Sequence, residues 1–418
     1  MKRQAIPFTG ALLATAALAL AACGGGGGSS SGGASGGSGG QVELRWAMSA
    51  DSQAEVDVWQ KLADDVTAKY PNITVKLETT AYKDYYNKLT TQAAGNDLPC
   101  IAGLQAQRMA DVGSLYMPLN DKLDGLVNID DYDSSIVDGL TDGGNLLAVP
   151  YDLGPYVIFY NVDMFKAAGI EEPQPGWTYD EFLAAAKALT KDGKYGFAID
   201  GTPDMWLPFV LSIGGTYLDA DGSPDLTNPK VVEGFTTVVD LATKEKVAPA
   251  LPATGASNWP SDQWRNGNVA MVIDGPWQLI NARNTVDFEV GLTTTPAIDG
   301  KSVTTMSGTG FGITQSCSNP TEAAQAISVI IGKDSQEYIA KEGRGFPAYK
   351  AAQQYWYEVA DVPTAKAAID KALETVDPFR TAPGWNRVNS LMQQYAVQAF
   401  NGQATPEEVL QQVQDGYK

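Results

Sequence analysis

The chain has 418 residues, with 29 Lys and Arg against 49 Asp and Glu, and it contains no histidine. Its formal net charge is −20 and 44% of its residues are hydrophobic, so a wholly disordered acidic chain is excluded. Such a negative field disfavours nucleic acid or an anionic membrane surface as the main partner. Without histidine, catalysis by Ser-His-Asp or Cys-His and metal binding by imidazole are excluded. A chain of this length usually divides into two lobes or domains.

Residues 1–22 have the pattern of an export signal. A positive start, Met1-Lys2-Arg3, precedes an apolar run from Gly10 to Ala22, which is too short to span a bilayer but long enough for a signal-peptide core. The run ends in Leu20-Ala21-Ala22-Cys23, which resembles a bacterial lipobox, where the Cys is lipidated and becomes the N-terminus. We therefore expect an exported protein, anchored through Cys23 to the outer face of the bacterial cytoplasmic membrane. The alternative is an ordinary cleaved signal with an incidental Cys.

Residues 24–40 contain only Gly, Ser and one Ala, which predicts a flexible linker between the lipidated Cys23 and the folded body. Two further cysteines, Cys100 and Cys317, lie in the body. They could form a disulfide, which an exported protein permits, or remain two buried free thiols. A metal site made of two lone cysteines without histidine is not expected.

From residue 41, short β-rich runs alternate with amphipathic stretches, which predicts an α/β fold. Strands are predicted over 42–46, 73–78 and 100–104, with helices over 51–70 and 82–94 between them. This order begins an open, mostly parallel sheet, which binds ligands at the C-terminal ends of its strands. Further strands are predicted over 156–160, 195–199, 269–273 and 310–314, and the final third is mostly helical. Thr405-Pro406-Glu407-Glu408 predicts a capping box that opens the last helix.

Several segments spread over the body resemble one family. They are Trp46–Ser49 followed by the strand Pro71–Val75, Val149–Asp152 with Val157–Phe165, Pro175–Phe182, Trp264–Trp277, and Gly402–Leu410. Because these pieces occur in the family's order, the chain resembles the extracellular (family 1) solute-binding proteins of ABC importers. Within that family it is similar to the group that takes up maltose and other oligosaccharides.

The resemblance implies a two-lobed α/β fold of the periplasmic-binding-protein type II class, in which helices flank each sheet and the ligand binds between the lobes. We place lobe 1 at 41–152 plus about 312–342, and lobe 2 at 153–311 plus about 343–418. The chain would cross between the lobes near 150–157 and 305–312, and a third crossing could lie near 341–347. Hinge closure would trap a di- or oligosaccharide, and membrane permease subunits would recognise the loaded form. We expect a monomer that needs no cofactor or metal and binds no nucleic acid.

Sugar rings present an apolar face and a rim of hydroxyls, so a site for them needs aromatic plates beside carboxylate, amide or guanidinium groups. The predicted ligand-binding residues are Trp277, Tyr151, Trp206 and Phe311 as aromatic plates, and Asp152, Gln107, Ser49, Asp51, Gly310 and Arg380 as polar or backbone contacts. Alternatives remain: a core position for Trp277, helix N-caps for Ser49 and Asp51, and an exposed ion pair for Arg380.

Two other function classes stay open. A secreted glycoside hydrolase that uses two carboxylates needs no histidine, so composition does not exclude it. A surface adhesin that binds glycan or protein without transport is the second. We expect the solute-binding protein, without enzymatic activity.

Overall fold

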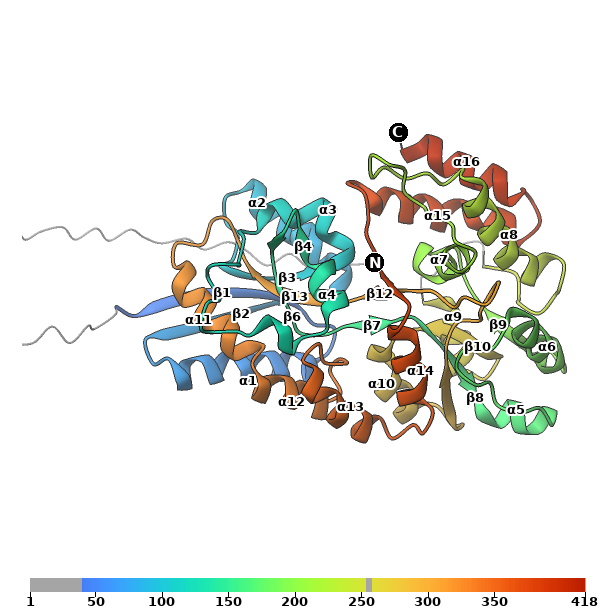
Figure 1. Ribbon diagram of the computed structural model, residues 1–418, viewed down its shortest axis with the longest axis horizontal. Coiled ribbons are helices and arrows are strands. Elements are labelled where there is room, and N and C mark those ends of the chain that lie inside the picture. The colour runs from blue at the N-terminus through green and yellow to red at the C-terminus, as the bar shows by residue number, and fades with distance from the viewer. Residues whose placement is uncertain (1–39, 253–257, 418) are drawn as a thin grey trace, which may run out of the picture. The chain divides into compact units, whose positions relative to one another are not determined.

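The computed structural model describes residues 40–252 and 258–417 of the chain. The described residues from 41 onward form one compact unit. The predicted signal peptide, the lipidation site Cys23 and the linker up to residue 39 lie outside the described residues. Within the body, Figure 1 shows two groups of elements, each built around its own sheet.

Lobe 1 contains a five-stranded sheet in the order β2-β1-β3-β13-β6. Its strands are β1 (Val42–Ser49), β2 (Ile73–Thr80), β3 (Ile101–Gln105), β6 (Val149–Pro150) and β13 (Thr309–Ile313). β1 pairs in parallel with β2 and β3, so the C-terminal ends of these three strands meet at one edge. β13 runs antiparallel to both β3 and β6.

The helices of lobe 1 cover this sheet (Figure 1). They are α1 (Gln53–Lys69), α2 (Tyr82–Ala94), α3 (Met109–Val112), α4 (Ser134–Gly139), α11 (Pro320–Ile330), α12 (Lys333–Lys341) and α13 (Gln353–Ala360), with a small hairpin of β4 (Thr141–Asp142) and β5 (Asn145–Leu146). Ser52 caps α1, because its hydroxyl accepts a hydrogen bond from the amide of Glu55 at 3.3 Å. α1 then buries Trp59, Leu62 and Val66, at spacings of three and four residues, and packs against β2 and α11.

Lobe 2 contains a four-stranded sheet in the order β11-β8-β10-β9. Its strands are β8 (Val157–Asn161), β9 (Tyr195–Ala198), β10 (Val269–Asp274) and β11 (Val290–Thr293). Its helices are α5 (Val162–Ala168), α6 (Tyr179–Leu189), α7 (Pro203–Ser212), α8 (Pro229–Thr243), α9 (Trp259–Arg265), α10 (Leu279–Thr285), α14 (Ala365–Leu373), α15 (Trp385–Phe400) and α16 (Pro406–Tyr417).

The two hydrophobic clusters of the body lie on opposite faces of β8. Val157 and Phe159 belong to one cluster, whereas Ile158 and Tyr160 belong to the other. Successive strand side chains point to opposite faces, so a strand that is buried on both faces reads as a continuous apolar run. This explains why β8 lacks the polar alternation of a half-exposed strand.

The strand and helix predictions are confirmed, with ends that shift by a few residues. The predicted capping box is also present. The amide of Glu408 donates to the Thr405 hydroxyl at 3.1 Å, and the amide of Thr405 donates to Glu408 Oε2 at 2.8 Å. Pro406 is the first residue of α16, where its missing amide hydrogen costs no helical bond.

Three short strands form a separate sheet between the two larger ones, in the order β14-β12-β7 (Figure 1). They are β7 (Gly154–Pro155), β12 (Thr304–Ser307) and β14 (Val376–Pro378). The first crossing lies between β6 and β7, and the second lies at Gly308, between β12 and β13. A third passage follows α13, because α13 packs against α12 of lobe 1 whereas α14 packs against β8 and β11 of lobe 2.

Two expected lobe boundaries are wrong. Residues 309–311 were expected in lobe 2, but they lie in β13 and pair with β3 of lobe 1. Lobe 1 also extends through α13 rather than ending near 342. The segment near 341–347 runs beside the first crossing instead of forming a third one, because the amide of Leu153 donates to the Phe346 carbonyl at 3.0 Å and that of Ala348 donates to the Tyr151 carbonyl at 3.1 Å.

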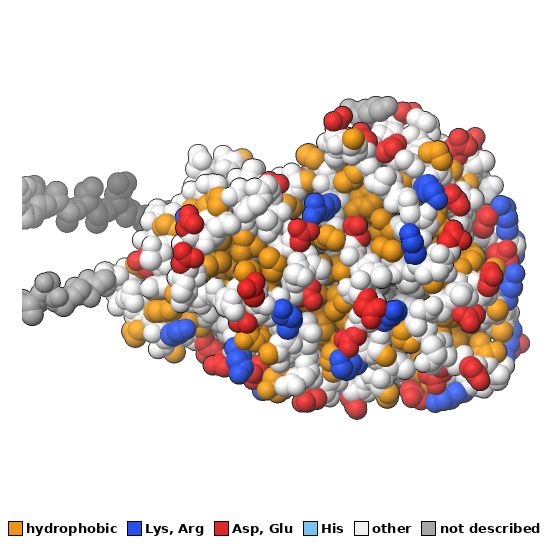
Figure 2. Space-filling view, viewed as in Figure 1, with side chains coloured by type: hydrophobic (Ala, Val, Ile, Leu, Met, Phe, Trp, Pro, Cys, Tyr) orange, Lys and Arg blue, Asp and Glu red, His pale blue; other side chains and the backbone are white. Residues whose placement is uncertain are grey.

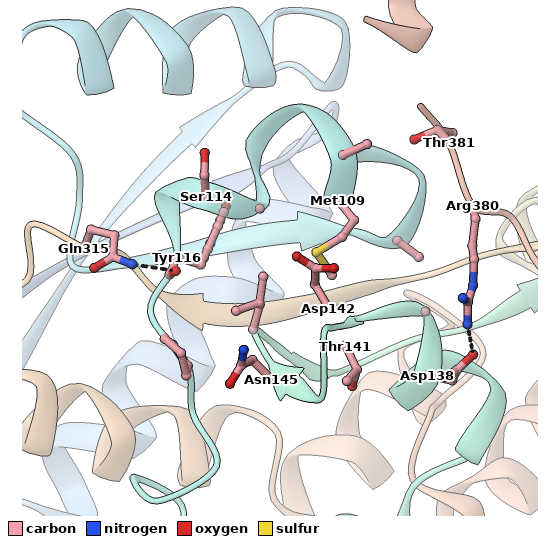
Figure 3. Close-up of a pocket in the computed structure, with 16 residues that line it drawn as sticks. Met109, Ser114, Tyr116, Asp138, Thr141, Asp142, Asn145, Gln315, Arg380 and Thr381 are labelled. Atoms are coloured by element: carbon pink, nitrogen blue, oxygen red, sulfur yellow. Dashed lines mark hydrogen bonds and ion pairs between the residues drawn. The ribbon is translucent and has the colours of Figure 1, made fainter. Parts of the chain in front are cut away.

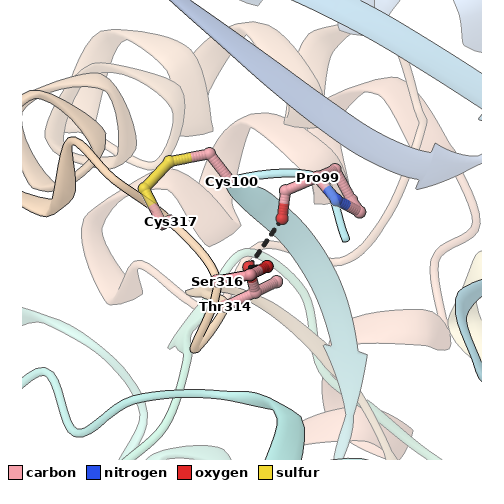
Figure 4. Close-up of a disulfide and its surroundings, with 5 residues drawn as sticks. All are labelled: Pro99, Cys100, Thr314, Ser316 and Cys317. Atoms are coloured by element: carbon pink, nitrogen blue, oxygen red, sulfur yellow. Dashed lines mark hydrogen bonds between the residues drawn. A yellow bond between two sulfur atoms is a disulfide. The ribbon is translucent and has the colours of Figure 1, made fainter. Parts of the chain in front are cut away.

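Of the two alternatives for the body cysteines, the structure shows the disulfide between Cys100 and Cys317 (Figure 4). Cys100 precedes β3 and Cys317 follows its neighbour β13, so strand pairing brings them together. Thr314 strengthens this junction, since its amide donates to the Cys100 carbonyl at 3.0 Å and its hydroxyl to the Pro99 carbonyl at 2.7 Å. The bond spans 217 residues of sequence and joins the two stretches of lobe 1 that the excursion through lobe 2 separates.

Charged side chains of both signs lie interspersed on the face of the molecule in Figure 2. On lobe 1, Arg45 forms ion pairs with Glu78 and Asp97, both at 2.6 Å. The hydrogen bond from Arg45 lowers the pKa of the Glu78 carboxyl.

Across residues 40–252 and 258–417, no helix is both long and apolar enough to cross a membrane.

Replacing both Cys100 and Cys317 with serine should lower the free energy of unfolding by about 2–5 kcal/mol, because the cross-link restricts the unfolded chain. Urea denaturation followed by tryptophan fluorescence measures the change as a lower midpoint. Wild-type protein treated with a reductant is the matched control and should reach the same midpoint. An unchanged midpoint for the variant would show that the bond adds nothing to stability.

Candidate ligand-binding site

The C-terminal edge of the lobe 1 sheet presents an aromatic ring held by two polar contacts. The amide of Tyr82, the first residue of α2, donates to Asp51 Oδ1 at 3.0 Å. The Tyr82 hydroxyl donates to Oε1 of Gln105, the last residue of β3, at 3.1 Å. The Tyr82 side chain is 41% exposed, and among the described residues no other large hydrophobic side chain is as exposed. The ends of β1, β2 and β3 therefore fix this ring at the surface of lobe 1.

A guanidinium group lies over a second tyrosine ring, that of Tyr86. Arg108 ends the short helix η1 (Ala106–Arg108), and its guanidinium carbon lies 5.2 Å from the centre of the Tyr86 ring, in a cation–π arrangement. The Tyr86 hydroxyl in turn accepts the amide of Gln105 at 2.9 Å. Nε of Arg108 is buried and has no hydrogen-bond partner among the described residues.

The facing edge of lobe 2 carries two carboxylates and an indole. Asp204, the second residue of α7, accepts a hydrogen bond from the Tyr156 hydroxyl at Oδ2, at 2.8 Å. Its other oxygen, Oδ1, is buried and has no partner among the described residues. Asp274 ends β10, and its two oxygens accept bonds from the Ser261 hydroxyl at 2.7 Å and the Gly275 amide at 2.8 Å.

Trp277 follows β10 in the short helix η4 (Pro276–Gln278), as its position after a predicted strand indicated. Its ring meets the Tyr156 ring edge to face, with centroids 5.4 Å apart, and it is partly exposed. Gly154 leaves room for the indole, since a Cβ there would lie 2.7 Å from a carbon of the Trp277 ring. Trp277 of lobe 2 therefore packs directly against Gly154, which lies next to the first crossing.

Charges on the two edges act on each other. Burial raises the pKa of Asp204, and the hydrogen bond from Tyr156 and the positive charge of Arg108, in lobe 1, lower it. Burial also raises the pKa of Tyr156 well above its ordinary value, and the nearby Asp204 and the Tyr82 of lobe 1 add to the increase. Burial raises the pKa of Asp274 as well. We refer to these residues together as the interlobe site: Asp51, Tyr82, Gln105 and Arg108 from lobe 1, and Tyr156, Asp204, Asp274 and Trp277 from lobe 2.

Three predicted aromatic plates lie in the hydrophobic core instead, which corrects the expectation that they stack on a sugar. Trp206 is fully buried, packs on Phe235 with ring centroids 5.1 Å apart, and donates from Nε1 to the Gly201 carbonyl at 3.1 Å. Tyr151 and Phe311 are also buried and stack on each other at 5.2 Å. An aromatic residue beside an Asp in sequence need not point the same way, because neighbouring side chains diverge.

Gly310 serves sheet packing rather than ligand contact. It lies inside β13, where a Cβ would come within 2.7 Å of the Val149 carbonyl oxygen of β6. Ser49 is partly exposed at the end of β1, and its carbonyl accepts the Trp59 indole at 3.2 Å. The N-cap of α1 is Ser52, so neither Ser49 nor Asp51 caps that helix.

Gln107 and Asp152 form hydrogen bonds with residues at or near the crossings between the lobes. Gln107 accepts the Ser307 hydroxyl at Oε1, at 3.2 Å, and the Thr381 hydroxyl at its carbonyl, at 2.8 Å. Asp152 Oδ1 accepts the amide of Thr309 at 2.7 Å. A ligand would therefore meet Asp152 only through its other oxygen.

A cavity of about 490 Å³ lies between α3, the β4–β5 hairpin and the segment that contains Arg380 and Thr381 (Figure 3). Arg380 lines this cavity, but its guanidinium forms an ion pair with Asp138 at 2.5 Å. Both side chains are mostly exposed, so Arg380 forms the exposed ion pair that was the alternative to a ligand contact. The aromatic residue in the lining is Tyr116, which is buried and donates its hydroxyl to the Gly103 carbonyl at 2.8 Å. The cavity therefore presents no aromatic face to a sugar, whereas the interlobe site presents one from each lobe.

Six residues of the interlobe site were not among the predicted ligand-binding residues: Tyr82, Gln105, Arg108, Tyr156, Asp204 and Asp274. A usable signal existed for Tyr82, since it follows the second parallel strand just as Gln107 follows the third. Asp204 lies two residues before Trp206 in the chain, and the structure brings its carboxylate rather than the Trp206 ring to the interlobe site. As for metals, the described residues contain no group of three or more Cys, Asp or Glu that could hold an ion.

The comparisons with known proteins agree with this architecture. A family model for bacterial extracellular solute-binding proteins matches residues 49–337. A lactose-binding protein of Rhizobium radiobacter is 26% identical over 304 residues, which cover 69% of this chain and 70% of the relative. A maltooligosaccharide ABC transporter solute-binding lipoprotein of Streptococcus pneumoniae is 24% identical over 303 residues, which cover 69% of this chain and 68% of the relative.

Solved structures show the same fold. A substrate-binding protein of Listeria monocytogenes in complex with cycloalternan has a TM-score of 0.79 at 22% identity, covering 90% of this chain and 97% of the other. Maltose-bound MalE3 of T. maritima has a TM-score of 0.74 at 22% identity, covering 90% and 98%. The predicted two-lobed type II α/β fold is thereby confirmed. Because the family model matches more than half of its length, the chain belongs to the bacterial extracellular solute-binding proteins.

Proposed function

We propose that this chain is the solute-binding component of an ABC importer and that it captures a di- or oligosaccharide at the interlobe site. The observation that carries the proposal is an unpartnered, buried carboxylate oxygen, Asp204 Oδ1, on the edge of lobe 2 that faces the Tyr82 ring and carries the Trp277 ring. Relatives named for binding lactose and maltooligosaccharide support a carbohydrate.

Each group has a role that suits a sugar. Tyr82 and Trp277 would stack on the apolar faces of sugar rings, one from each lobe. Asp204 would accept a hydrogen bond from a sugar hydroxyl at Oδ1, and Arg108 would donate a hydrogen bond from its free Nε, so two unsatisfied buried groups would gain partners. Because these contacts come from both lobes, a bound sugar would favour the arrangement in which the lobes approach each other.

The geometry favours binding over hydrolysis. A glycoside hydrolase needs one carboxyl to transfer a proton and a second to attack or to activate water. Both oxygens of Asp274 are held, by the Ser261 hydroxyl and the Gly275 amide, and one oxygen of Asp204 is held by Tyr156. This leaves a single free oxygen on the two carboxylates. One free oxygen can accept a hydrogen bond from a sugar hydroxyl, whereas a catalytic pair needs a free oxygen on each carboxyl.

Anchoring and delivery belong to the same proposal. A lipid on Cys23 would hold the protein at the outer face of the cytoplasmic membrane, and the Gly/Ser linker would let the body reach the permease subunits. The lipoprotein named among the relatives supports this arrangement.

A thermal-shift screen with lactose, maltose, maltotriose and larger malto- and cyclic oligosaccharides tests the proposal. A sugar at 100 times its dissociation constant should stabilise the protein by about 2.7 kcal/mol, which raises the melting temperature. A shift from one or more sugars is expected. If no sugar in the panel moves the melting temperature, the carbohydrate assignment fails and an adhesin gains support.

Trp277→Ala and Tyr82→Ala should each weaken binding of the stabilising sugar at least tenfold, since ring stacking is worth roughly 1–3 kcal/mol by analogy with stacking on bases. Calorimetric titration measures the affinity. Tyr195→Ala is the matched control, because Tyr195 begins β9 and lies at the opposite end of the strand from the interlobe site. Unchanged affinity in a folded Trp277 or Tyr82 variant would remove that ring from the site.

Cys23→Ser should release the protein from the membrane fraction into the soluble fraction, because the thiol that carries the lipid is lost. Fractionation of cells followed by immunoblotting measures the distribution. Retention of the serine variant in the membrane fraction to the same extent as the wild type would contradict lipid anchoring at this position.

A further inference from the structure

Asp152 lies where three separate stretches of the chain meet. From the first crossing, its Oδ1 accepts the amide of Thr309, which belongs to the second crossing, at 2.7 Å. In return, the Thr309 carbonyl accepts the amides of Tyr151 at 2.9 Å and Asp152 at 3.4 Å. The third stretch contributes Gly345, where a Cβ would lie 3.2 Å from Asp152 Oδ2. One side chain thus joins the two crossings to each other and borders the third stretch.

Arg344 is the charged residue of that third stretch. Its guanidinium lies over the Trp59 ring, 5.0 Å from its centre, and pairs with Glu55 of α1 at 3.6 Å. The Arg344 side chain is only 16% exposed, and its Nε has no hydrogen-bond partner among the described residues. A single ion pair at 3.6 Å therefore does not account for the burial of a full positive charge.

The end of α12 fixes the position of Arg344. Gly343 adopts a left-handed conformation with φ of 67°, and its amide donates to the Ala340 carbonyl at 3.1 Å. The amide of Arg344 then donates to the Ile339 carbonyl at 3.1 Å, which completes a Schellman cap. The cap turns the chain back so that Arg344 faces the crossing rather than continuing the helix.

We propose that Arg344 is the positioning residue of the hinge: its buried positive charge holds the Asp152 carboxylate against the amide of Thr309 and so ties the first two crossings together at one point. The lobes would then open and close about a fixed pivot. The proposal concerns the chain alone and does not depend on which solute binds at the interlobe site.

The charges around Asp152 support this role. The pKa of Asp152 is raised to about 6, because the effect of burial exceeds the opposite effects of the Arg344 positive charge, the Thr309 amide and the Tyr151 hydroxyl. Glu55 and Asp51, from the α1 side, and Tyr151 act on Arg344 itself. Removing Arg344 would therefore move the Asp152 pKa further up, and the carboxyl would be protonated over more of the neutral range.

The sign of the stability effect follows from the direction of this shift. The folded-state pKa of Asp152 lies above its ordinary value of about 4, so ionisation of this group costs stability as the pH rises through that interval. Arg344 reduces the cost, but only when Asp152 is charged. The loss caused by Arg344→Gln should therefore be smaller at pH 5 than at pH 7.5.

Hydrogen exchange measured by mass spectrometry tests the tie directly on the full chain at pH 7. In Arg344→Gln and in Asp152→Ala, the peptide that contains Thr309 should exchange roughly three- to tenfold faster, because its amide loses its acceptor in Asp152→Ala and the acceptor loses the charge that holds it in place in Arg344→Gln. Arg344→Lys should keep most of the wild-type protection. Arg45→Gln is the matched control, since Arg45 forms its ion pairs elsewhere on lobe 1, and it should leave this peptide unchanged.

Melting temperatures at pH 5 and pH 7.5 test whether Arg344 acts through Asp152. The difference between wild type and Arg344→Gln should grow by roughly 2 °C between the two pH values. In an Asp152→Asn background, which keeps the acceptor oxygen but removes the charge, the effect of Arg344→Gln should be the same at both. Wild-type protection of Thr309 in Arg344→Gln, or an equal pH dependence in the Asn background, would overturn the proposal.

Discussion

The pairing of the first two crossings at Thr309 is the constraint on which the rest of the structure depends. The Thr309 carbonyl accepts the amides of Tyr151 and Asp152, and the Thr309 amide donates to Oδ1 of Asp152, so both backbone polar groups of Thr309 are bonded to the first crossing. Each lobe is assembled from stretches that are far apart in sequence. The strand ends of lobe 1 can therefore face those of lobe 2 only if the first and second crossings lie side by side. The disulfide between Cys100 and Cys317 secures the same junction from the far end of β3 and β13.

The aromatic cluster beneath this junction explains why several expected sugar contacts belong to the core. Phe311 lies among Trp46, Trp59 and Tyr151, with ring centroids between 5.1 and 5.9 Å away. These rings fill lobe 1 where β13 enters its sheet, and Arg344 covers the outer face of Trp59. Tyr82 and Trp277, the aromatic residues of the interlobe site that are at least partly exposed, follow the ends of strands instead.

Much of the fold could be predicted from the sequence because its signals are local. The helix over 82–94, the strands around it and the capping box at Thr405 follow from hydrophobic period and cap chemistry, and the resemblance supplied the two-lobed arrangement. The lobe boundaries were harder to predict, because whether α13 packs on α12 or on lobe 2 depends on tertiary contacts.

The position of Trp277 at the site could be predicted, since it follows a strand at a turn. The position of Trp206 could not, because its burial within α7 depends on Phe235, which lies almost 30 residues away. Arg108 and Asp204 come from different lobes, and no sequence pattern shows that they act on each other.

A sugar held between the lobes, in contact with both, should change how far apart they lie. Small-angle X-ray scattering of the protein with and without a saturating amount of the sugar that stabilises it most measures this directly. Capture between the lobes predicts a smaller radius of gyration in the presence of the sugar, a weaker change in Trp277→Ala at the same sugar concentration, and recovery of the sugar uncleaved. A radius of gyration that stays the same at saturation, or hydrolysis of the sugar, would contradict capture between the lobes.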